Sequence, residues 1–345
     1  MRTGVIVPVH GWAPLLAETL DAILGQDPRP EIVVVVDDGS PEWLVLHPDH
    51  APHCMLVRHE ECLGLAAARA TGLAQLDTEL VALCDDDDAW EPGKHAAQVA
   101  ALAEHPDAAV CIGHAQIVGL DGRQTGEHWE ELPAGLHRAD ELVVSLYERN
   151  PLCVSSALLR RQALLAVGGF AGPAPAPTAT ADWDLWLRLL AAGHAFVMEP
   201  RAVVRYRRKL GALTADITGL ASAQMVVHEV HAGLVREEQR MRVEAADRAA
   251  RARGLVRDRA WRAARAELRR VATLSRAPTC GDRVLGVALA VPGARAVLGR
   301  RDPYVRAPSR LRRWLRTLPG LGAVQERRRA GLLARTRSAG RHARP

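Results

Sequence analysis

Two apolar runs that each end in a group of carboxylates constrain the fold of this chain most strongly. Residues 31–36 (EIVVVV) precede Asp37 and Asp38, and residues 80–84 (LVALC) precede four consecutive aspartates, Asp85–Asp88. Continuous apolar runs are typical of parallel strands that helices cover on both faces. Ligands bind at the carboxyl ends of such strands. The sequence therefore predicts a polar site at one edge of an α/β sheet.

Further strands and helices are expected in the first 90 residues. Residues 4–9 (GVIVPV) and 55–58 are short and apolar, which predicts two more strands. Residues 15–24 place leucine and isoleucine at helical spacing, and residues 64–76 are rich in alanine, so each segment predicts a helix. Strands that alternate with helices favour a mostly parallel sheet.

The four aspartates 85–88 suggest a site for a divalent cation. Neighbouring carboxylates repel one another unless a cation, water or basic groups compensate them, and oxygen ligands suit magnesium, manganese or calcium. Two simpler interpretations stay open. The run is also what a solvated loop looks like, and Asp37-Asp38-Gly39-Ser40 is also a common turn sequence.

The charges divide the chain into two parts. Residues 1–204 hold 12 Lys and Arg against 29 Asp and Glu, whereas residues 205–345 hold 33 against 11. An acidic globular part and an arginine-rich tail predict two roles, the second with an anionic partner such as a membrane surface, a polyphosphate-bearing substrate or nucleic acid. A basic tail that only aids solubility is the simpler alternative.

Cysteine spacing and the N-terminus bear on the compartment. The six cysteines lack CxxC spacing, so neither a zinc site nor a disulfide framework is expected. The apolar segment 5–9 is too short for a secretory signal and contains Pro8. We therefore expect a cytoplasmic protein.

Six segments, in this order, resemble those of inverting family 2 glycosyltransferases, which have the GT-A fold and use nucleotide sugars. They are VIVPVHG (5–11), VVVDDGS (34–40), GLAAARATGL (64–73), ALCDDDDAWEPGKH (82–95), SSALLRRQALLAVGGF (155–170) and ADWDLWLRL (181–189). The resemblance implies a GT-A domain over residues 1–215, followed by a basic, mainly helical extension over 216–345. It also implies transfer of one sugar, since the QxxRW signature of processive synthases is absent.

The resemblance implies a role for residues at the expected donor site. Pro8, Val9 and His10 would line the pocket of the nucleotide base, with His10 where the family often has an aromatic ring. Asp38 would contact the edge of the base. Arg69 would lie near the base and the diphosphate.

The acidic run and a later segment are implied to hold the rest of the donor. Asp86 would contact the ribose, and Asp87, shared with Asp85, would coordinate Mn²⁺ or Mg²⁺. The family pattern has one carboxylate fewer, which leaves the ligand pair open by one position. Lys209 stands where the family commonly has a histidine, and it would neutralise the leaving diphosphate.

Asp182 is the implied catalytic base. It precedes an amphipathic pattern that predicts a helix, so by position alone it is better explained as an N-cap. The family match favours the base, which would take the proton of an acceptor hydroxyl. The preceding residues 172–180 form either an acceptor loop or a spacer. Asn150 and Ser155 are implied to lie nearby, unless they only end a strand.

The basic extension suggests where the protein acts. Residues 256–274 have the pattern of an amphipathic helix with an arginine face, and residues 284–298 are too short to span a bilayer. We expect a peripheral contact with the anionic inner face of the membrane. The acceptor would be a hydroxyl of a glycan, a lipid-linked sugar or a small molecule. A sugar-nucleotide-binding scaffold, or a nucleic-acid-binding protein that uses the tail, is the alternative; no specific nucleic-acid motif is present.

Overall fold

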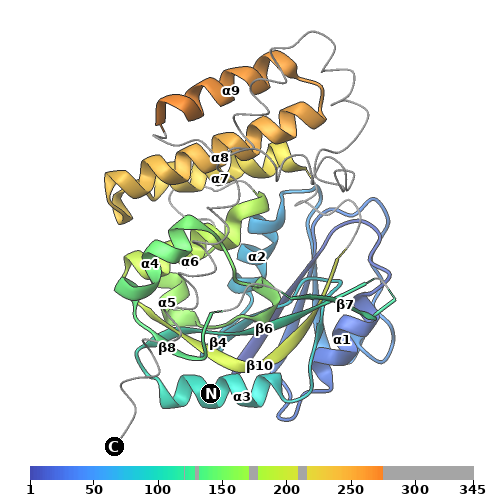
Figure 1. The fold of residues 1–345 in the computed structure, drawn as a ribbon. Coiled ribbons are helices and arrows are strands. Elements are labelled where there is room, and N and C mark those ends of the chain that lie inside the picture. Colours follow the sequence, from blue (N-terminus) through green and yellow to red (C-terminus); the bar gives the residue numbers. More distant parts are fainter. Residues whose placement is uncertain (120, 129–131, 171–177, 209–215, 275–345) are drawn as a thin grey trace, which may run out of the picture.

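The computed structural model describes residues 1–119, 121–128, 132–170, 178–208 and 216–274 (Figure 1). A ten-stranded sheet in the order β3-β2-β1-β4-β9-β6-β10-β5, with β7 beside β6 and β8 beside β10, forms the centre of this part. The strands are β1 (Thr3–Val9), β2 (Ile32–Asp37), β3 (Cys54–Arg58), β4 (Leu80–Leu83), β5 (Ala89–Trp90), β6 (Ala108–Val118), β7 (Gln124–His128), β8 (Gly135–His137), β9 (Leu158–Arg160) and β10 (Ala195–Arg207).

Helices cover both faces of the sheet, as the apolar strands predicted (Figure 1). They are α1 (Leu16–Leu24), α2 (Leu65–Ala74), α3 (Lys94–Glu104), α4 (Ala139–Glu148), α5 (Arg161–Ala166), α6 (Ala181–Ala191), α7 (Ile217–Val230), α8 (Glu237–Arg257) and α9 (Trp261–Leu274). Helices α1 and α3 pack on one face, and α2, α4, α5 and α6 pack on the other. The α/β class and the expected strands and helices of the first 90 residues are confirmed, with ends that differ by at most two residues.

The register of the first strands brings the predicted carboxylates to one edge. Strand β1 pairs in parallel with β2 and β4, and β2 pairs in parallel with β3. Val9 lies opposite Asp37, and Ile6 lies opposite Leu83. The sheet is mixed beyond this point, because β9, β5, β7 and β8 each pair antiparallel with their neighbours.

Close packing of α2 on β1 fixes the helix over this edge. A Cβ atom added to Gly72 would lie 2.5 Å from a methyl carbon of Ile6. Only glycine allows the helix to approach the strand this closely. The approach holds α2, and with it Arg69, against the carboxyl end of the sheet.

Helices α7, α8 and α9 form a stack on the side of α4 and α6 (Figure 1). Val227 of α7 and Val243 of α8 join the core that α4 and α6 share with the sheet. The expected helix over residues 256–274 is in fact two helices: α8 ends at Arg257, Arg259 adopts a left-handed conformation (φ 60°), and α9 begins at Trp261.

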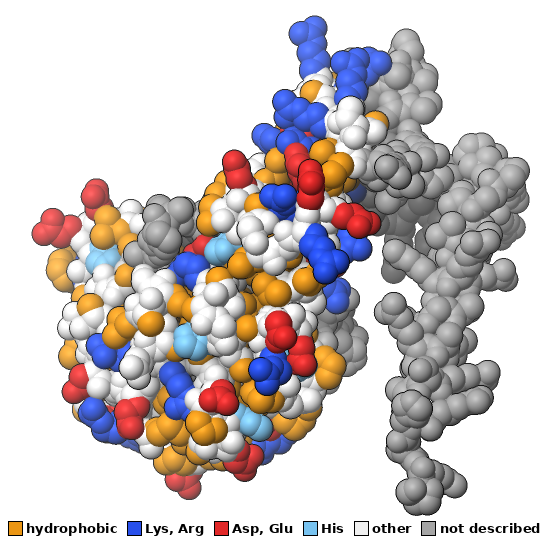
Figure 2. Space-filling view, turned by 90° about the vertical axis from the view of Figure 1, so that its left-hand side faces the viewer, with side chains coloured by type: hydrophobic (Ala, Val, Ile, Leu, Met, Phe, Trp, Pro, Cys, Tyr) orange, Lys and Arg blue, Asp and Glu red, His pale blue; other side chains and the backbone are white. Residues whose placement is uncertain are grey.

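The surface of this stack is rich in arginine. Figure 2 shows basic side chains, all arginine in α8 and α9, gathered at the end of the molecule that these helices form. No helix in the described ranges is long and apolar enough to cross a membrane. Residues 284–298, considered above for that role, lie outside the described residues.

Candidate active site

The acidic run forms the turn that follows β4. Asp85, Asp86 and Asp87 are half-buried, and Asp88 is buried. The hydroxyl of Thr19 in α1 donates to the backbone oxygens of Asp86 (3.1 Å) and Asp88 (2.8 Å). The solvated-loop interpretation does not fit this turn, because α1 holds its backbone in place.

Asp88 anchors the turn from inside. The hydroxyl of Ser155 donates to its Oδ2 atom (2.5 Å), and the backbone amide of Arg207 donates to its Oδ1 atom (3.0 Å). Ser155 also accepts a hydrogen bond from the backbone amide of Asp85 (3.0 Å). Burial raises the pKa of Asp88 well above its usual range, and the charges of Asp85 and Asp87 raise it further.

The crowded carboxylates therefore fit a cation. Burial chiefly raises the pKa of Asp88, the charges of Asp85 and Asp87 add to the increase, and a divalent ion would relieve that repulsion. The half-buried carboxylates Asp85 and Asp87 are hard oxygen donors of the kind that Mn²⁺ and Mg²⁺ prefer.

Asp182 lies in the first turn of α6, half-buried. It is the second residue of the helix, so it does not precede the helix as expected, and Thr180 occupies the N-cap. The side-chain amide of Asn150 donates to Asp182 Oδ2 (2.9 Å). Burial raises the pKa of Asp182 and Asp85 raises it further, while the charge of Arg69 and the bond from Asn150 offset part of the increase. The capping alternative does not fit this geometry.

Arg69 connects the acidic run with Asp182. Its guanidinium Nη2 donates to Asp85 Oδ1 (2.8 Å), and its side chain is buried. Its charge also lowers the pKa of Asp182, so Arg69, Asp85 and Asp182 lie near one another; the roles expected of them stay predictions. Asn150 and Ser155 belong to the same site and do not merely end a strand.

Asp38 forms the centre of a second cluster, at the ends of β1, β2 and β3. Its Oδ1 atom accepts hydrogen bonds from His59 Nδ1 (2.7 Å) and the amide of Leu63 (2.8 Å), and its Oδ2 atom accepts from the amide of Gly64 (2.8 Å) and the thiol of Cys62 (3.4 Å). Burial alone would raise the pKa of Asp38, but these donors outweigh it and lower the pKa. Asp38 thus organises the loop before α2; contact with a base stays a prediction.

His10 lies beside this cluster. It is exposed, and its Nδ1 atom lies 2.8 Å from the backbone oxygen of Asp38. Pro8 and Val9 precede it with buried side chains. A ligand-type atom of His10, one of Asp38 and one of Cys62 lie within 4.8 Å of one another, yet four protein donors already satisfy the Asp38 carboxylate.

Helix α2 joins the two clusters. Its Thr71 hydroxyl bonds His59 Nε2 (2.8 Å), and its Arg69 bonds Asp85. Sequence reasoning did not single out Thr19, Thr71 or His59, because each has a distant partner and no motif of its own. Lys209 lies outside the described residues.

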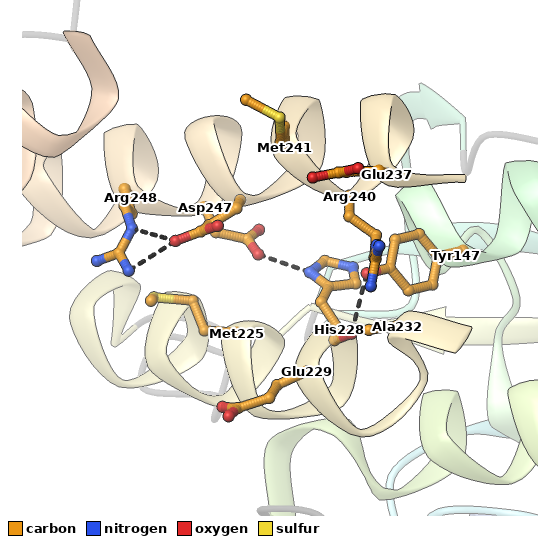
Figure 3. Close-up of a pocket in the computed structure, with 11 residues that line it drawn as sticks. Tyr147, Met225, His228, Glu229, Ala232, Glu237, Arg240, Met241, Asp247 and Arg248 are labelled. Carbon is orange, nitrogen blue, oxygen red and sulfur yellow. Dashed lines mark hydrogen bonds and ion pairs between the residues drawn. The ribbon is translucent and has the colours of Figure 1, made fainter. Parts of the chain in front are cut away.

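A cavity of about 490 Å³ lies apart from these clusters, between α4, α7 and α8 (Figure 3). Tyr147, His228 and Asp247 line it together with methionine, glutamate and arginine side chains. None of the residues predicted from the sequence lies in its wall.

The central sheet with helices on both faces is an arrangement of the GT-A type. Residues 4–168 match the profile of Glycosyl transferase family 2. Residues 4–168, a little under half of the chain, therefore form a domain of glycosyl transferase family 2, as the resemblance of the segments indicated.

Three similar proteins are informative. An uncharacterized protein of Mycobacterium tuberculosis is 29% identical over 200 residues, which cover 56% of this chain and 55% of the relative. The pre-mycofactocin glycosyltransferase of the same organism is 30% identical over 207 residues, 59% of this chain and 42% of the relative. The chain thus spans about half the length of these relatives.

A solved structure supports the fold. S. aureus TarS, residues 1–349, in complex with UDP-GlcNAc superposes with a TM-score of 0.56 at 15% identity, over 87% of this chain and 91% of that chain. At this identity the likeness confirms the GT-A fold and nothing further.

We expect Asp88→Asn to be nearly neutral for stability and Asp88→Ala to be costly. Asparagine keeps an acceptor for the Arg207 amide and a partner for Ser155, and it removes charge that burial disfavours. Alanine leaves both donors unpaired, at about 1–3 kcal/mol. Urea unfolding followed by circular dichroism measures the difference. Equal losses in both variants would mean that the site needs an ionised Asp88.

Proposed function

We propose that this protein is a metal-dependent, inverting glycosyltransferase that moves one sugar from a nucleoside-diphosphate sugar to an acceptor hydroxyl. The observation that carries the proposal is the position of Asp182, a carboxylate of raised pKa that shares one site with Arg69 and the acidic run. Such a carboxylate is suited to proton transfer near neutral pH.

Asp182 acts as the general base. Its carboxylate takes the proton of the acceptor hydroxyl while the hydroxyl oxygen bonds to the anomeric carbon of the sugar. The bond from that carbon to the diphosphate oxygen breaks on the opposite face, so a single displacement inverts the centre. General-base catalysis typically contributes ~10²- to 10⁴-fold. The amide of Asn150 orients the carboxylate.

The acidic run and Arg69 serve the leaving group. Asp87 and Asp85 would hold a Mn²⁺ or Mg²⁺ ion, which stabilises negative charge on the departing diphosphate. Arg69 adds a fixed positive charge beside Asp85. Asp86 binds the ribose, while Pro8, Val9, His10 and Asp38 surround the base; Lys209 supports the diphosphate.

The named relatives support this class of donor. One is a glycosyltransferase, and a protein of the same fold binds UDP-GlcNAc. The acceptor class is a hydroxyl of a glycan, a lipid-linked sugar or a small molecule. A binding scaffold without turnover is the second candidate, and the measurements below distinguish the two.

We expect one nucleoside diphosphate to bind in a manganese-dependent manner. Calorimetric titration with UDP, GDP and dTDP, each with and without Mn²⁺, identifies it, and the monophosphate CMP is titrated in the same way for comparison. Asp87→Asn should abolish the dependence on Mn²⁺, because the ion loses a charged ligand. The exposed Asp49→Asn is the matched control. Failure of all four nucleotides to bind would exclude the proposed donor site.

Asp182→Asn should bind the donor normally and lose turnover by ~10²- to 10⁴-fold. Release of the nucleoside diphosphate from the donor, with water as the acceptor, measures turnover without a known acceptor. Asp140 occupies the same position in α4 that Asp182 occupies in α6 and is exposed. Asp140→Asn should therefore retain full turnover.

The pH profile gives a second readout for Asp182. A base must be ionised to act, so turnover falls as the pH falls through the pKa of Asp182. Because that pKa is raised, the loss begins above the ordinary range of aspartate. Near-normal turnover of Asp182→Asn, or a rate independent of pH, would refute the assigned base.

We further propose that the basic extension rests on the anionic inner face of the membrane. Arg262, Arg265 and Arg269 of α9 are exposed, whereas the one acidic residue of this helix, Glu267, is buried and paired with Arg248 and Arg251. Each arginine near an anionic surface contributes about 1 kcal/mol.

Sedimentation of the full chain with lipid vesicles tests this contact. Binding should require anionic lipid and weaken as salt rises. Changing the three arginines of α9 to glutamate should weaken binding more than changing the exposed Arg123 and Arg138 to glutamate. Two outcomes would contradict the proposal: an equal loss of vesicle binding in the two sets of variants, or equally strong binding of the wild type to vesicles without anionic lipid.

A further inference from the structure

The first turn of α6 has two sides, and only one of them belongs to the active site. Asp182 faces Arg69 and Asn150. The next residues, Trp183 and Asp184, are buried and contact α4 and α7 instead. The position of Asp182 therefore depends on what holds these two neighbours.

Asp184 is held by a histidine of the basic extension. Its Oδ1 atom accepts a hydrogen bond from His231 Nε2 (2.8 Å), and its Oδ2 atom accepts from Arg188 Nε (2.8 Å). Both Asp184 and His231 are buried. Burial would raise the pKa of Asp184, but the bonds from His231 and Arg188 outweigh it and lower the pKa, so the pair joins an ionised carboxylate to α7.

Arg188 also bonds the backbone of the segment that follows α5. Its Nη1 atom donates to the backbone oxygens of Val167 (2.5 Å) and Gly169 (2.8 Å). A chain of side-chain contacts thus connects the end of α7 with the first turn of α6 and with the backbone at residues 167–169. It runs through His231, Asp184 and Arg188.

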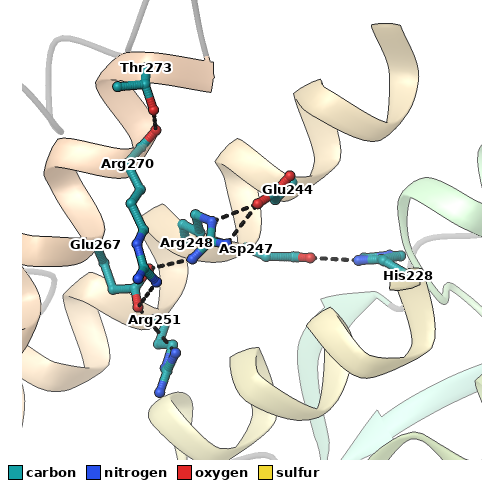
Figure 4. A network of polar contacts seen from close by, with 8 residues as sticks. All are labelled: His228, Glu244, Asp247, Arg248, Arg251, Glu267, Arg270 and Thr273. Carbon is teal, nitrogen blue, oxygen red and sulfur yellow. Dashed lines mark hydrogen bonds and ion pairs between the residues drawn. The ribbon is translucent and has the colours of Figure 1, made fainter. Parts of the chain in front are cut away.

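Trp183 is held by a second histidine, His228 of α7. Its indole nitrogen donates to the backbone oxygen of Leu146 (2.6 Å), and its ring meets the ring of His228 edge-on at 4.8 Å. His228 in turn donates to Asp247 of α8 (2.6 Å), as Figures 3 and 4 show. The hydroxyl of Tyr147 donates to the backbone oxygen of His228 (2.9 Å).

We propose that His231 is a positioning residue for the transfer reaction, which it serves through Asp184 by fixing the first turn of α6 and thereby the carboxylate of Asp182. The proposal rests on the function proposed above, in which Asp182 is the base. The His228–Asp247 pair braces the same turn through Trp183. The extension after residue 215 is therefore needed for turnover as well as for any surface contact.

The expected effect follows from the geometry of a helical turn. Asp182 and Asp184 share a rigid turn, so a rotation that releases Asp184 moves the carboxylate of Asp182. A displacement of about 1 Å at a reacting group lowers a rate by up to ~10²-fold. Donor contacts from other elements are unaffected, so the loss appears in kcat and not in donor affinity.

Two amide substitutions with different reach test the proposal. In His231→Gln the side-chain amide nitrogen reaches about as far as Nε2 and can donate to Asp184, whereas in His231→Asn the amide is too short. We expect kcat within about threefold of wild type for glutamine and at least about tenfold lower for asparagine. Donor affinity by calorimetry should stay within about twofold in both.

A control variant and the wild-type protein distinguish a failure of the positioning role from a failure of the proposed function. His194→Ala, beyond the other end of α6, should keep full kcat. If the wild-type protein releases no nucleoside diphosphate from any donor, the proposed function itself fails. If the wild type turns over and the two His231 variants have equal kcat, the positioning role is wrong. Equal losses of kcat and donor affinity in His231→Asn would also overturn it, because they indicate a general structural role.

Discussion

The Asp88 carboxylate connects three segments that are far apart in the sequence. It bonds the Ser155 hydroxyl and the backbone amide of Arg207 from within the turn after β4. A buried carboxylate costs free energy unless donors satisfy it, so the fixed shape of the acidic turn depends on both partners. Asp85 and Asp87 flank this anchor, half-buried. The turn can therefore hold charge at one place without collapsing or rotating, which is the condition for a preorganised site.

Helix α2 extends this order to the other strand ends. Arg69 bonds Asp85, and Thr71 bonds His59, which in turn bonds Asp38. Two clusters that belong to different strands are thus held by the same helix. The close approach of Gly72 to Ile6 fixes that helix on the sheet. A ligand that spans the two clusters would meet groups whose spacing is already set, so little ordering would be lost on binding.

The sequence predicted those parts of the site that carry a local signal. Apolar runs with carboxylates at their ends specified the strands and the sheet edge, because burial on both faces demands such runs. The hypothesis that Asp182 is the catalytic base came only from the family resemblance. An aspartate at the start of a helix is also typical of an N-cap. Ser155 and Thr19 contact residues 67 and 69 positions away, and no local pattern reveals such pairs. The break at Arg259 was missed because arginine rarely adopts positive φ.

The excess of arginine in the sequence reflects only the exposed side of the extension and gives no information on its buried side. Its arginines point outward on α9, and this face produced the prediction of a basic appendage. Val227 of α7 and Val243 of α8 pack against the core, and His231, directly after α7, bonds Asp184. Because the inner contacts lie on and next to α7 and α8 and the exposed arginines lie on α9, the two sets of side chains do not compete. Residues 216–274 therefore contact the first turn of α6 through one face and expose positive charge on another.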